Sequence, residues 1–69
     1  MKLSARKVLK GTVSKIVPGS VNSEVTLKVA GGAKIDSTIT NEAVANLGLT
    51  EGMAAYAVIK ASNVIAAVD

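Results

Sequence analysis

Two short polar triplets near the ends of the chain carry the residue types best suited to binding a small anion. They are Ser4-Ala5-Arg6 and Lys60-Ala61-Ser62. Arginine offers a planar fork of N–H donors, lysine a compact positive charge, and serine a neutral hydroxyl donor. The small alanines leave backbone N–H groups accessible, and such groups can form an anion-binding concavity. The triplets therefore predict an oxyanion site, although ordinary surface cations would give the same residue types.

The remaining polar residues argue against catalysis. The chain has no His and no Cys, so no imidazole can activate its hydroxyl groups and no thiol is present. The acidic residues are dispersed, as solvated surface charges usually are: Glu24, Asp36, Glu42, Glu51 and Asp69. An acid–base pair or a divalent-cation site would need them clustered. We expect no enzyme activity, no catalytic cofactor and no metal cation bound directly by side chains.

Two glycine-containing segments could in principle hold a phosphate. They are Pro18-Gly19-Ser20 and Gly31-Gly32. Neither continues into the Lys–Ser/Thr pair of a nucleotide-binding loop, so turns are the preferred interpretation. A backbone N–H of Gly19 or Ser20 could still contact an anion in an assembly.

Length and composition favour one small domain, residues 1–69, that works as a homo-oligomer. A chain of 69 residues buries about 60% of its unfolded surface and is marginal alone. Disulfides are impossible without Cys, and a structural zinc site would need His or Cys. Hydrophobic residues make up 49% of the chain, more than one small core would hide. Oligomerisation is the remaining way to bury them.

Charge and targeting signals are modest. The net charge of +3 favours anions weakly, and Tyr56 is the only aromatic residue, so a nucleic-acid surface would lack stacking platforms. The cationic start of the chain does not resemble a signal peptide, and no apolar run approaches the ~20 residues of a membrane helix. We expect a cytoplasmic protein that binds neither membranes nor nucleic acid.

The apolar pattern predicts mainly β-strands. Residues 8–17 form a β-rich stretch that ends at Pro18-Gly19-Ser20. Residues 21–29 alternate apolar and polar side chains, as a half-buried strand does. A tight turn at residues 30–33 leads to a returning strand at 34–40. Two further strands are expected at residues 54–59 and 63–68.

One short helix interrupts this pattern. Thr40 or Asn41 can cap its first turn, and Glu42 suits the positive end of the helix dipole. Gly48 is well placed to end it after about two turns. A helix between the third and fourth strands of a small all-β chain predicts an OB-like, five-stranded Greek-key barrel.

An ordered set of short segments carries a family resemblance over essentially the whole chain. The segments are Ser4-Ala5-Arg6, Leu9-Lys10-Gly11, Gly19-Ser20-Val21-Asn22-Ser23-Glu24-Val25, Gly31-Gly32, Ile39-Thr40-Asn41-Glu42, Leu47-Gly48-Leu49-Thr50-Glu51-Gly52 and Ala57-Val58-Ile59-Lys60-Ala61-Ser62-Asn63-Val64. In this order they resemble the molbindins, small molybdate- and tungstate-binding proteins made of one Mop (TOBE-type) domain.

The resemblance implies an OB-like barrel assembled as a hexamer, a trimer of dimers, with oxyanions bound between subunits. Matching positions imply one class of site in which the first triplet, Ser4, Ala5 and Arg6, meets the second, Lys60, Ala61 and Ser62. Thr40 of the partner subunit would contribute to this class. A second class near a threefold axis would use the loop Gly19, Ser20, Val21 and Asn22.

Two positions depart from the family pattern. Lys7 stands where the family usually has Asn, and Ala43 stands where many relatives have Ser. Neither change removes a cation, so we expect binding to survive with altered affinity or selectivity.

The sequence therefore predicts reversible binding of molybdate or tungstate, for intracellular storage or buffering. An OB-fold nucleic-acid module is the main alternative, and salt-dependent retention on single-stranded DNA would favour it. An accessory domain of a transporter ATPase or a repressor is a third. The start at Met1 and the end soon after the last expected strand favour a free-standing protein.

Overall fold

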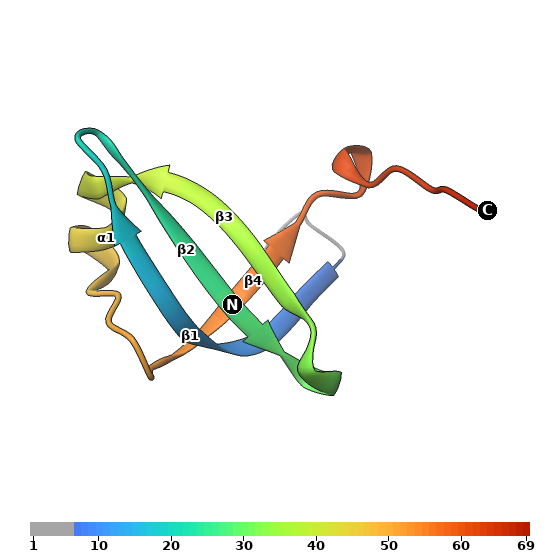
Figure 1. Cartoon of the computed structure of the whole chain (residues 1–69), viewed down its shortest axis with the longest axis horizontal. Helices are drawn as coiled ribbons and strands as arrows, with labels where there is room; N and C mark the ends of the chain where they lie inside the picture. Colours follow the sequence, from blue (N-terminus) through green and yellow to red (C-terminus); the bar gives the residue numbers. More distant parts are fainter. Residues whose placement is uncertain (1–6) are drawn as a thin grey trace.

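The computed structural model describes residues 7–69. Its elements are β1 (Lys7–Pro18), β2 (Asn22–Val29), the 3₁₀ turn η1 (Ala30–Gly32), β3 (Lys34–Thr40), α1 (Asn41–Leu47), β4 (Ala54–Ile59) and the 3₁₀ turn η2 (Ala61–Asn63). The strands form one antiparallel sheet in the order β3-β2-β1-β4. This is the Greek-key order, since β4 returns to lie beside β1. The sheet curls strongly, so β4 crosses the other strands (Figure 1).

The predicted strands before the helix are confirmed, and so is β4. Along β2 the buried and exposed side chains alternate, with Ser23, Val25 and Leu27 buried. Val13 and Ala57 join Val25 and Leu27 in the core. These four are the only buried hydrophobic side chains among residues 7–69. The core of a single chain is therefore small for its apolar content.

A bulge bends β1, which pairs with both β2 and β4 in the curled sheet. The pairing of β1 with β2 shifts between Val13 and Lys15, and the Ser14 hydroxyl donates to the backbone oxygen of Thr26 at 3.2 Å. Val13 N donates to Met53 O at 2.9 Å, and Gly52 N donates to Val13 O at 2.7 Å. An extra residue of this kind bends a strand and increases its twist.

The helix begins and ends where the sequence predicts. The Thr40 side chain accepts a hydrogen bond from Ala43 N at 3.0 Å, which makes Thr40 the N-cap. Gly48 ends the helix in the left-handed conformation, with a φ of 63°. The helix lies beside the β1–β2 hairpin and the end of β3 (Figure 1). It therefore closes this end of the curled sheet.

The prediction of a last strand at residues 63–68 is wrong for the single chain. After β4 the chain makes the turn η2 and then leaves the sheet, so residues 64–69 pair with none of the strands in residues 7–69. Ile65 and Val68 are 91% and 97% exposed, and Figure 1 shows this C-terminal segment pointing away. A fifth strand would have to lie between the edges of β3 and β4. The predicted all-β, OB-like fold class is confirmed, but the barrel formed by the described part of one chain is open.

Val13 allows a test of this fold. The side chain is 0% exposed, so Val13→Ala removes two buried methyl groups and leaves a void. We expect the free energy of unfolding to fall by about 2 kcal/mol. Urea unfolding at one fixed protein concentration measures it, because oligomerisation makes stability concentration-dependent. The control is Thr12→Ala, an exposed neighbour on the same strand. Equal stability of the two variants would contradict the assigned core.

Candidate oxyanion site

The second predicted triplet forms an exposed turn directly after β4. Lys60 precedes η2, and its backbone oxygen accepts from Asn63 N at 2.9 Å. Val64 N donates to Ala61 O at 3.2 Å. Lys60, Ala61 and Ser62 are all exposed. A cation, a small residue and a hydroxyl are thus held in a tight turn that is open to a ligand.

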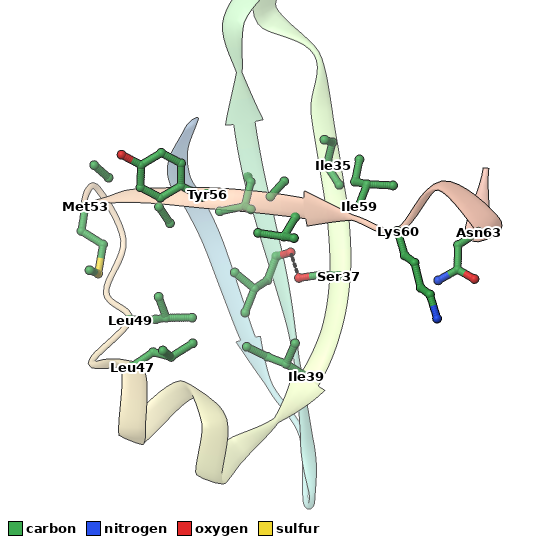
Figure 2. Close-up of a pocket in the computed structure, with 16 residues that line it drawn as sticks. Ile35, Ser37, Ile39, Leu47, Leu49, Met53, Tyr56, Ile59, Lys60 and Asn63 are labelled. Carbon is green, nitrogen blue, oxygen red and sulfur yellow. Dashed lines mark hydrogen bonds between the residues drawn. The ribbon is translucent and has the colours of Figure 1, made fainter. Parts of the chain in front are cut away.

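Asn63 is a further polar residue at this turn that the sequence reasoning did not assign. Figure 2 shows its amide and the Lys60 side chain on the same side of η2, beyond the end of β4. An amide can donate to an oxyanion as a serine hydroxyl does. The sequence feature that could have identified Asn63 is its position directly after the triplet Lys60-Ala61-Ser62.

The start of β1 lies beside this turn. Lys7 is the Cα partner of Ile59, the residue that precedes Lys60. The predicted residues Ser4, Ala5 and Arg6 lie outside the described residues, but by sequence they directly precede Lys7. The described sheet therefore brings the point where the first triplet joins β1 next to the second triplet.

Thr40 lies at the other end of the sheet within one chain. It ends β3, opposite Asn22 of β2, and its hydroxyl caps α1. The hydrophobic β3 residues that precede it, Ile35 and Ile39, separate it from the Lys60 end along the strand. One chain thus does not bring Thr40 to Lys60. The expectation that a partner subunit supplies Thr40 stays a prediction.

The loop predicted as a second anion site connects β1 to β2 and lies next to Thr40. Gly19 N donates to Asn22 O at 2.8 Å and closes the hairpin. Ser20 and Val21 form its exposed tip. A Cβ on Gly19 would lie 2.6 Å from the Asn22 oxygen, so only glycine fits this approach. Within one chain, Thr40 therefore belongs spatially with this loop.

A long apolar groove lies between β3 and β4, the two edge strands of the described sheet. Its volume is about 650 Å³. Ile35 and Ile39 line one side, Leu49 and Met53 lie toward one end, and Lys60 and Asn63 lie at the other end (Figure 2). Ser37 faces the groove, but its hydroxyl already donates to Val25 O at 3.1 Å. The groove suits an apolar segment, and only its Lys60 end suits an anion.

Among residues 7–69, no group of three or more acidic residues could hold a metal ion. The same residues contain no helix long and apolar enough to cross a membrane.

Comparisons with known proteins agree with this small open barrel. Residues 3–66 match the TOBE domain model. The probable molybdenum-pterin-binding protein of Haemophilus influenzae is 46% identical over the full length of both chains. MopII from Clostridium pasteurianum superimposes with a TM-score of 0.92 at 42% identity, covering 97% of this chain and 100% of its own.

A molybdate-bound structure is also similar. The cytoplasmic molybdate-binding protein ModG superimposes with a TM-score of 0.90 at 60% identity, over 94% of this chain and 46% of ModG. The fold and the exposed cationic turn define a small OB-like ligand-binding domain. The chain belongs to the TOBE family and, within it, to the molbindins, the molybdenum-pterin-binding (Mop) proteins.

Proposed function

We propose that this protein binds molybdate or tungstate reversibly between the subunits of a cytoplasmic homo-oligomer, as a store or buffer. Residues 1–69 form its single Mop domain. The observation that carries the proposal is the position of the exposed Lys60-Ala61-Ser62 turn, next to the start of β1. Ser4, Ala5 and Arg6 would complete the site from that side. The site would offer two cations, two hydroxyls and backbone N–H groups to one tetrahedral dianion.

The relatives support the choice of ligand. ModG binds molybdate, and the Haemophilus and Clostridium proteins are named for molybdenum. Tungstate is a tetrahedral dianion of nearly the same size, so hydrogen-bond donors of this kind would treat the two alike. A resident cofactor has no part in this proposal, because the oxyanion is the cargo and the protein only binds it.

The exposed apolar surface supports an oligomer. Val64, Ile65 and Val68 follow η2 and are 61%, 91% and 97% exposed. Their β-branched side chains suit a strand, and β3 and β4 leave edges free on either side of the groove. We propose that residues 64–68 of one subunit fill the groove of another as its fifth strand. Pairs joined in this way would then assemble as a hexamer, a trimer of dimers.

This arrangement also explains why the oxyanion sites need the assembly. Residues 64–68 directly follow the Lys60-Ala61-Ser62 turn, so inserting them into a second subunit carries the turn onto that subunit. Thr40 ends β3, one of the two edges of the groove. The partner's Thr40 hydroxyl would contribute to the site, although it caps α1 in the single chain.

Equilibrium dialysis against molybdate at physiological salt tests the proposed function. We expect saturable binding that tungstate displaces, and a native mass several times 6.9 kDa. Sulfate in the same assay measures selectivity, which depends on the size of the cavity. An absence of saturable binding, or a monomer that binds molybdate fully, would contradict the proposal.

A further inference from the structure

Asn41 makes three hydrogen bonds that hold the β1–β2 loop against the start of α1. Its Nδ2 donates to Gly19 O at 2.9 Å, and its backbone N donates to Val21 O at 2.8 Å. Its Oδ1 accepts from the Ser23 hydroxyl. Ser23 is 3% exposed, the only buried polar side chain among residues 7–69. The tip of the loop, Ser20 and Val21, is exposed, but the half-buried side chain of Asn41 holds the loop in place.

These hydrogen bonds fix the directions in which the C=O and N–H groups of the loop point. The described peptide bonds are all trans, and in a trans peptide the C=O and the following N–H point in opposite directions. Since the Gly19 carbonyl points at Asn41, the Ser20 N–H points away from it. Within residues 7–69, the N–H groups of Ser20 and Val21 have no protein acceptor outside the strands and helices. Three carbonyls of the loop, those of Gly19, Val21 and Asn22, accept hydrogen bonds, while these two N–H groups at the tip do not donate to the described protein.

This is the arrangement that an oxyanion requires. A carbonyl oxygen turned toward an anion repels it, whereas a free N–H or hydroxyl attracts it. We infer that Asn41, oriented by Ser23, is the positioning residue of the loop Gly19–Asn22. It holds the carbonyls of Gly19 and Val21 away from a bound oxyanion, so that Ser20 can donate to it. The inference rests on the proposed oxyanion function and on the second class of site that the family resemblance implies for this loop; the role of Asn41 is what it adds.

The test compares variants that leave the Lys60 turn unchanged. The double variant Ser23→Ala with Asn41→Leu replaces both members of a buried polar pair by apolar groups of similar shape, a change that can be nearly neutral for stability. The control Ser14→Ala removes another hydroxyl–carbonyl hydrogen bond of the sheet, away from both the loop and the groove. Molybdate dialysis measures the number and affinity of the sites on the intact oligomer.

We expect wild type to show two classes of site. The double variant should lose the loop class, or bind it at least tenfold more weakly, and keep the Lys60 class. Ser14→Ala should keep both. If the double variant fails to assemble, Ser23→Ala alone should still weaken the loop class severalfold. A merely structural role of Asn41 would instead weaken both classes together, in step with the midpoint of thermal unfolding.

The possible failures are distinguishable. No saturable binding by wild type would overturn the proposed function itself. Two classes of unchanged affinity in the double variant, or equal weakening of both, would overturn only the role of Asn41. A single class in wild type that Lys60→Ala abolishes would also overturn it, because the loop would then hold no anion.

Discussion

The Ile65→Asp protein is expected to be a 6.9 kDa monomer that no longer binds molybdate. Ile65 is 91% exposed in the single chain, so an aspartate there costs the isolated subunit little. In the proposed assembly the same side chain enters the apolar groove between β3 and β4 of another subunit. Burying an unpaired carboxylate there costs on the order of 4 kcal/mol or more, enough to prevent assembly at micromolar concentration. Analytical ultracentrifugation with and without molybdate measures the result.

Two controls separate assembly from charge. Thr12→Asp adds the same negative charge at an exposed position on β1, opposite Lys28, and should leave the mass and the binding unchanged. Ile65→Val keeps an apolar, β-branched side chain and should still assemble. If Ile65→Asp remained an oligomer with wild-type affinity, residues 64–68 would not form the fifth strand of a partner. A monomer that kept full affinity would contradict intersubunit sites.

Most of the fold could be predicted because its signals are local. Alternation along residues 21–29 depends on the pleat of one strand, and Thr40 and Gly48 mark the ends of α1 through bonds within a few residues. The last strand could not be placed in this way. Residues 64–68 have a strand-like composition, but a strand exists only when an edge pairs with it, and the described part of the single chain, residues 7–69, provides no such pairing.

The candidate site was predictable to the same degree. Lys60-Ala61-Ser62 stands out because it combines a cation and a hydroxyl in a largely aliphatic chain. The roles proposed for Thr40 and Asn41 depend on geometry between distant segments. Asn41 appears in the sequence only as a possible helix cap, whereas the structure connects it to Gly19, 22 residues away. Spacing along the chain carries no information on such a contact.

Lys60→Ala is expected to weaken molybdate binding by about 1.5–3 kcal/mol, the contribution of one charged hydrogen bond. This corresponds to roughly 10- to 150-fold in the dissociation constant. The change leaves the backbone turn intact, because Lys60 closes η2 through its carbonyl oxygen and not through its side chain. The oligomer should therefore persist, and the loss should appear in affinity alone.

Lys34→Ala is the matched control for this prediction. Lys34 is exposed on β3 opposite Lys28, and its removal changes the net charge by the same amount. If both variants lost affinity equally, net positive charge and not a specific site would attract the anion. Lys60→Arg should recover part of the affinity, since it restores the charge with a different donor geometry. Unchanged affinity in Lys60→Ala would remove Lys60 from the site and leave the turn with only its hydroxyl and backbone donors.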